Sequence, residues 1–67
     1  MRLKELREDR DITQREIAEL LHVKQNTYSQ YENNHREIPI CMLIELARFY
    51  NVSIDYILGE TNNPKRY

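Results

Sequence analysis

The 67-residue chain has a formal net charge of -1, one glycine, two prolines and a single cysteine. A chain of this length holds one domain at most, and a core of this size stabilises a fold by only about 3 to 5 kcal/mol. The lone Cys41 excludes an internal disulfide, and the absence of a leader-like apolar segment or an apolar run of about 18 residues predicts a cytoplasmic protein.

Basic and acidic residues are mixed along the chain. Residues 1–37 hold seven basic and eight acidic residues, and residues 38–67 hold three of each. Bulk charge therefore gives no support to nucleic-acid binding, which a basic face often reveals. Any attraction to DNA has to come from the local placement of a few cations and polar groups.

A first helix is predicted over residues 1–9, although Leu3 and Leu6 on one face are a thin apolar signal. Asp9 and Asp11 follow as a helix end and a turn. No histidine, nucleophile or glycine-rich phosphate loop lies near these carboxylates in the sequence. We therefore expect no enzymatic activity.

The second predicted helix has two independent start signals. Thr13 is placed as the N-cap with Glu16 reaching back to it, and Ile12 and Ile17 are spaced to pack across the first turn. The helix is expected to end near Leu21. Its inward residues are predicted to be Ile17, Ala18, Leu20 and Leu21.

A third helix is predicted from about Lys24 to Glu32. It offers few residues for burial, namely Tyr28 and Tyr31 together with Val23 just before it. The opposite face is rich in amides and hydroxyls. That face comprises Lys24, Gln25, Asn26, Ser29 and Gln30.

A fourth helix is the most apolar element, and Pro39 suits its first turn because proline has no N–H to leave without a partner. Its apolar residues recur at helical spacing: Ile40, Leu43, Ile44, Leu46, Ala47 and Tyr50. Ser53 is placed to cap a short fifth helix that ends at Gly59. The sequence thus predicts an all-α domain over residues 1–59, with residues 60–67 as a frayed C-terminal tail.

Two sets of residues carry a resemblance to a known family. The first would seal a steep crossing of two helices and comprises Ile17, Ala18, Leu21, Val23, Tyr28 and Tyr31. The second lies outside the crossing and comprises Leu6-Arg7, Thr13-Gln14, Tyr31-Glu32-Asn33, Leu46-Ala47 and the run from Val52 to Gly59. In these residues the chain resembles the lambda-repressor-like, Cro-type (XRE) helix-turn-helix family. The resemblance implies a compact five-helix domain that reads operator DNA, usually as two subunits on half-sites about one helical turn apart.

The exposed face of the third helix carries the chemistry that such reading needs. Gln and Asn can bond adenine in bidentate fashion in the major groove, and Lys can meet the acceptors of guanine. The expected base-reading residues, which match the family's positions, are Lys24, Gln25, Asn26, Ser29 and Gln30. Phosphates are expected at the positive ends of the second and third helices. The expected phosphate contacts are Thr13, Gln14, Thr27, Asn33, His35 and Arg36.

The resemblance also assigns structural roles and exposes departures from the family pattern. It places Arg7 and Glu32 together as an ion pair that joins the first helix to the end of the third. His22 stands at a usual glycine position in the tight turn, where a left-handed residue costs about 1 kcal/mol. Lys24 stands where Ser or Thr usually caps the third helix. Asn34, at another glycine position, enters the left-handed region readily.

Other interpretations stay open. The amide-rich face can be an ordinary solvated surface, and the chain can be a protein-interaction or antitoxin-like module with weak or no DNA binding. His22, His35 and Cys41 match no zinc spacing, and Cys41 is expected to be a partly buried small hydrophobe, so no metal, cofactor or small ligand is predicted. A homodimer, fully formed on DNA, would have to draw on the remaining apolar residues: Ile54, Ile57, Leu58 and Tyr67.

Overall fold

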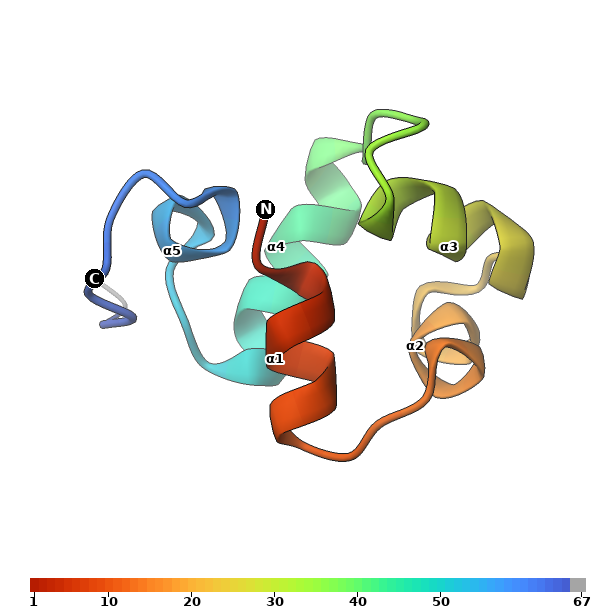
Figure 1. Cartoon of the computed structure of the whole chain (residues 1–67), viewed down its shortest axis with the longest axis horizontal. Helices are drawn as coiled ribbons and strands as arrows, with labels where there is room; N and C mark the ends of the chain where they lie inside the picture. The colour runs from red at the N-terminus through yellow and green to blue at the C-terminus, as the bar shows by residue number, and fades with distance from the viewer. Residues whose placement is uncertain (66–67) are drawn as a thin grey trace.

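The computed structural model describes residues 1–65, which contain five helices and no strand. The helices are α1 (Leu3–Asp9), α2 (Gln14–Leu21), α3 (Gln25–Glu32), α4 (Ile40–Tyr50) and α5 (Ile54–Leu58). Along the longest axis, α2 and α3 lie at one end, α5 lies at the other, and α1 and α4 lie between them (Figure 1). The predicted all-α, five-helix fold is confirmed. The first helix begins at Leu3, two residues later than predicted.

One apolar cluster holds the five helices together. Tyr28, Leu46 and Ile57 are fully inaccessible at its centre, and every helix contributes at least one buried residue. The residues of the cluster are Leu3, Leu6, Ile17, Ala18, Leu21, Tyr28, Tyr31, Ile38, Leu43, Leu46, Ala47, Tyr50, Val52 and Ile57. α2 packs chiefly against α3, and α4 against α5. This pairing fixes α3 on α2 as a helix-turn-helix.

Two helices begin where the sequence places their caps. The Thr13 hydroxyl accepts a hydrogen bond from the Glu16 N–H at 3.1 Å, and the Ser53 hydroxyl accepts one from the Tyr56 N–H at 3.0 Å. Each bond satisfies one of the N–H groups that a helix start leaves without a partner. The return bond expected from the Glu16 side chain to Thr13 is not formed in the described chain, so that part of the prediction is wrong.

The chain turns between helices at residues with positive φ. His22 (φ 59°) ends α2 and Asn34 (φ 59°) lies in the loop after α3, as predicted. Asp11 and Asn51 adopt the same left-handed region, and these two turns were not predicted. Asp and Asn enter this region more readily than most residues, so composition permits these turns without requiring them.

The inward position predicted for Leu20 is wrong, and two apolar residues of α4 that recur at helical spacing are exposed as well. Leu20 is 36% exposed, Ile44 is 37% exposed and Ile40 is 64% exposed, because the neighbouring helices cover only part of each apolar face. Pro39 is the N-cap of α4, one residue before the predicted first turn. Cys41, expected to be partly buried, is exposed.

Residues 60–65, the first part of the predicted tail, form several hydrogen bonds with the domain. The Arg2 guanidinium donates to the Asn62 side-chain oxygen at 2.7 Å and to the Thr61 carbonyl at 3.4 Å. The Ser53 N–H donates to the Pro64 carbonyl at 3.1 Å. Arg2 and its two partners lie 59 and 60 residues apart in sequence, so only the folded chain brings them together. The predicted contribution of Tyr67 lies outside the described residues.

In residues 1–65, no helix has both the length and the apolar character needed to span a membrane.

Candidate nucleic-acid interface

The two faces of α3 have opposite roles. Tyr28 and Tyr31 are buried in the core at 0% and 4% exposure and anchor the helix to α2. On the other side, Gln25, Asn26 and Gln30 are exposed. Their side chains form no hydrogen bond within residues 1–65, so their donors and acceptors are free for a ligand.

Most of the predicted site residues border one open depression along α3. These residues are Gln14, Gln25, Asn26, Ser29, Gln30, Asn33 and His35. Thr13 lines an adjoining hollow together with Gln14 and Gln25. Arg36 lines a different hollow, together with Met1 and Leu58. Thr27 is half-buried and Lys24 is exposed at the start of the helix.

The N-terminal end of α3 is suited to an anion. Lys24 occupies the N-cap with φ -73° and ψ 150°, and its side chain forms no capping bond. The first turn contains no acidic residue. A helix start with unsatisfied N–H groups and a partial positive charge is a favourable place for a phosphate, and the ammonium group of Lys24 adds to that potential.

The loop after α3 is held to the helix by backbone bonds. The N–H groups of His35 and Arg36 donate to the Gln30 carbonyl at 2.9 and 3.3 Å. The Asn33 side chain donates to the Ser29 hydroxyl at 3.3 Å. His35 and Arg36 are consequently fixed near the C-terminal end of α3, although both side chains are exposed.

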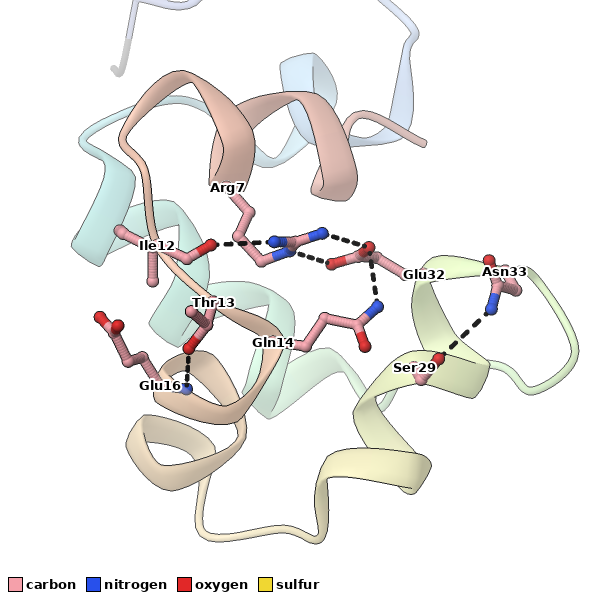
Figure 2. Close-up of polar contacts among 8 residues, drawn as sticks. All are labelled: Arg7, Ile12, Thr13, Gln14, Glu16, Ser29, Glu32 and Asn33. Carbon is pink, nitrogen blue, oxygen red and sulfur yellow. Dashed lines mark hydrogen bonds and ion pairs between the residues drawn. The ribbon is translucent and has the colours of Figure 1, made fainter.

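A buried ion pair connects α1 to the end of α3, as the resemblance implied. Arg7 Nε lies 2.8 Å from Glu32 Oε2, and Arg7 Nη2 lies 3.2 Å from Glu32 Oε1. Arg7 Nη1 also donates to the Ile12 carbonyl at 2.9 Å, and Gln14 Nε2 donates to Glu32 Oε1 at 3.2 Å (Figure 2). The side chains of Arg7 and Glu32 are only 13% and 2% exposed. This arrangement, here called the Arg7–Glu32 clamp, joins α1, α2 and α3.

The clamp changes the acidity of its members. Burial by itself would raise the pKa of Glu32, but the hydrogen bonds that the carboxylate accepts, first of all from Arg7, outweigh burial and hold that pKa below its ordinary value. The hydrogen bond to Glu32 raises the pKa of Arg7. Both groups therefore stay charged near neutral pH, and the pair persists there.

Burial, followed by the nearby Glu32 carboxylate, raises the pKa of Tyr28 far above its ordinary value. The Tyr28 hydroxyl nevertheless forms no hydrogen bond of acceptable geometry within residues 1–65, and neither does that of Tyr50. Burial also raises the pKa of Tyr50, to about 12, so both phenols stay neutral in the folded domain, which is consistent with their role as core residues.

Two features of this region were not predicted. Gln14, expected only as a phosphate contact, uses one N–H to bond Glu32. Arg10 donates to the Tyr50 carbonyl at 2.8 Å and lies over the Tyr50 ring at 4.9 Å. Neither contact has a local signal, because the partners are 18 and 40 residues apart in sequence.

Within residues 1–65, no three His, Cys, Asp or Glu side chains are gathered so as to hold a metal ion.

Residues 3–57 match the family model described as Helix-turn-helix (HTH_3). The chain belongs to this helix-turn-helix family. The match covers all of α1 to α4 and nearly all of α5, so the family assignment applies to the whole fold and includes the α2–α3 pair.

Curated relatives of this helix-turn-helix chain are bacterial. ImmR of Bacillus subtilis, an HTH-type transcriptional regulator, is 42% identical over 97% of this chain and 51% of its own length. YobD of the same organism, an uncharacterized HTH-type transcriptional regulator, is 40% identical over 94% of this chain and 56% of its own. The antitoxin PezA of Streptococcus pneumoniae is 33% identical over 87% of this chain and 37% of its own.

The chain thus spans about half the length of the regulators it matches. A comparison with solved structures gave no significant match.

Proposed function

We propose that this chain binds double-stranded DNA in a sequence-specific manner and regulates transcription in the cytoplasm, most simply by repression through occupancy of a promoter. One observation carries the proposal. The exposed side of α3 presents Gln25, Asn26 and Gln30 without internal partners, while Tyr28 and Tyr31 hold the helix rigidly from behind. The family membership of the chain and the names of its relatives support the same function.

In this proposal α3 lies in the major groove. Gln25, Asn26 and Gln30 bond adenine edges, with Lys24 and Ser29 beside them as further base contacts. The backbone contacts come from the start of α2, the start of α3 and the loop after α3. These phosphate contacts are proposed for Thr13, Gln14, Thr27, Asn33, His35 and Arg36.

We further propose that two subunits bind together on two operator half-sites. A single α3 reaches only a few base pairs, and a two-fold pair doubles the sequence that is read.

One relative supports the repression part of the proposal. RstR, a transcriptional repressor of the cryptic phage CTXphi in Vibrio cholerae, is 32% identical over 90% of this chain.

Titration of labelled duplex by fluorescence polarisation tests the proposal. Random duplex at low salt should bind weakly, and a site selected from a random library should bind at least about a thousandfold more tightly. Gln25→Ala plus Gln30→Ala should weaken binding to the selected site by about 30-fold or more, because each bidentate contact contributes about 1–3 kcal/mol. Circular dichroism checks that the variant stays folded.

The matched control is Lys4→Ala plus Glu5→Ala, which leaves the net charge unchanged and alters two exposed residues of α1. Its affinity for the selected site should equal that of the wild type. If the wild-type protein selects no site and binds no duplex at low salt, the proposal is wrong.

A second candidate function is a protein-interaction or antitoxin-like module on the same fold. The likeness to PezA favours it, as does the formal net charge of -1, because a chain without net positive charge attracts DNA poorly. The same titration separates the two functions. A folded domain that binds no duplex, and whose association with a partner protein survives the α3 substitutions, supports the interaction module.

A further inference from the structure

The exposed side of α3 offers one kind of base-reading group, the carboxamide. Gln25 and Asn26 lie in the first turn, and Gln30 lies one turn after Asn26. Four residues of a helix rise by about 6 Å, which is close to two base-pair steps of about 3.4 Å each. Asn26 and Gln30 can therefore meet different base pairs in the major groove.

Side chains that read guanine or cytosine are not available on α3 itself. Guanine is read best by Arg or Lys, and cytosine by a carboxylate. The helix contains no Arg, Lys or Asp, and its one carboxylate belongs to Glu32. That carboxylate is buried and turned toward Arg7 and Gln14 (Figure 2). The Arg7–Glu32 clamp thus keeps the carboxylate away from DNA, and the bidentate contacts left to α3 are those of amides with adenine.

Such a contact depends on one particular hydrogen of adenine. The amide oxygen accepts a hydrogen bond from adenine N6, and the amide N–H donates to adenine N7. One N6 hydrogen is held by thymine in the base pair, so only the other projects into the major groove. A methyl group on N6 that leaves the base pair intact has to replace this second hydrogen. It therefore removes the donor that the amide oxygen needs.

The surface along α3 offers nothing favourable to such a methyl group. Every residue that lines the depression along the helix is polar. An amide oxygen that faces the methyl group loses its water on binding and gains no hydrogen bond, which is unfavourable. Tyr28 and Tyr31 hold α3 from within the core, so the helix cannot withdraw from the methyl group without disturbing their packing.

We propose that α3 discriminates against adenine methylated on N6, so that adenine methylation of the operator prevents this protein from occupying it. The inference rests on the proposed function, because it concerns the same helix and the same bases. It adds a means of regulation to that function. The methylation state of the site, and not only its sequence, decides whether the protein binds.

Polarisation titration with methylated duplex tests the inference. The probe is a labelled synthetic duplex that carries the site selected from an unmethylated random library, with N6-methyladenine at one adenine at a time. Methylation of an adenine that α3 reads should weaken binding about tenfold, and methylation of two such adenines about a hundredfold. N6-methyladenine placed outside the selected site is the control on the DNA side and should leave the affinity unchanged.

Single alanine variants identify the amide that senses each methyl group. In each of Gln25→Ala, Asn26→Ala and Gln30→Ala, the adenine read by the lost amide should show a methylation effect within about twofold, because the bond is already missing. Arg36→Gln is the matched control on the protein side. It alters a proposed phosphate contact, so the effect of methylation should stay about tenfold. Circular dichroism confirms that every variant is folded.

Three results overturn the inference while leaving DNA binding in place. The first is a methylation effect below about twofold at every adenine of a site that the wild type binds. The second is a selected site without adenine. The third is an effect equally large in the wild type and in all three alanine variants, because the methyl group then acts through the duplex itself. A protein that selects no site and binds no duplex overturns the proposed function as well.

Discussion

Two groups of polar side chains on α3 differ in where they find hydrogen-bond partners. The Glu32 side chain is 2% exposed and accepts hydrogen bonds from Arg7 and Gln14, all within the protein. Gln25, Asn26 and Gln30, on the same helix, are exposed and have no internal partner. A polar side chain with its partners inside the fold maintains the fold, whereas one without them is available to a ligand.

The largest expected effect is on the Arg7–Glu32 clamp. Arg7→Met should lower the free energy of unfolding by about 3–5 kcal/mol, because it leaves the Glu32 carboxylate buried without its cation. Urea denaturation measures this loss, which is most of the stability of a domain this small. Arg15→Met is the control, since the Arg15 side chain is 78% exposed and its pair with Glu19 contributes less than about 1 kcal/mol. Equal stability of Arg7→Met and the wild type would contradict the clamp.

A smaller effect is expected on acidification. The pKa of Glu32 is lower in the folded state than its ordinary value, so the folded state binds this proton less readily than the unfolded state does. The stabilisation is therefore complete above the unfolded pKa of about 4.3 and is lost as the pH falls through the folded pKa. Urea unfolding at a series of pH values should show a shallower acid loss in Glu32→Gln than in the wild type. If both proteins lose stability equally with falling pH, Glu32 does not contribute to the acid sensitivity.

Substitutions at the N-caps of α2 and α3 should change the free energy of unfolding by about 1 kcal/mol each, in opposite directions. Thr13→Ala removes the observed capping bond and should cost about 1 kcal/mol of stability. Lys24→Ser supplies a cap that α3 lacks and should add about 0.5–1 kcal/mol, while weakening DNA binding because a cation is lost. Thermal unfolding and duplex titration measure the two effects. A Lys24→Ser variant that gains stability and keeps full DNA affinity would show that Lys24 does not contact DNA.

The smallest expected effect is on the salt dependence of DNA binding. Each cation that neutralises a phosphate contributes about -0.9 to the slope of log Kobs against log salt. Arg36→Gln should reduce the slope by about 0.9 per subunit. Arg10→Gln should leave it unchanged, because the guanidinium of Arg10 is held by the Tyr50 carbonyl and ring. A change with Arg10 and none with Arg36 would reverse the assignment of phosphate contacts.

Local signals predicted much of the fold. The caps at Thr13 and Ser53 and the left-handed Gly59 depend on chemistry within one helical turn, and the structure contains all three. The left-handed turn at His22 is also present, but it was implied by the family resemblance. The two-sided character of α3 was likewise readable, because helical spacing alone separates Tyr28 and Tyr31 from the amides. The Arg7–Glu32 pair came from the family resemblance, since no local pattern connects residues 25 positions apart.

The sequence by itself therefore determined which segments form helices, where most of them begin and end, and which side of α3 is polar, because these properties depend on neighbours within a few residues. The tertiary structure decided which polar groups find hydrogen-bond partners within the protein and which apolar residues stay exposed. Arg2 and Arg10 bond to carbonyl partners 40 or more residues away, and Ile40 and Ile44 of α4 stay exposed. Burial and pairing are properties of the assembled helices, since they depend on which surfaces the packing covers.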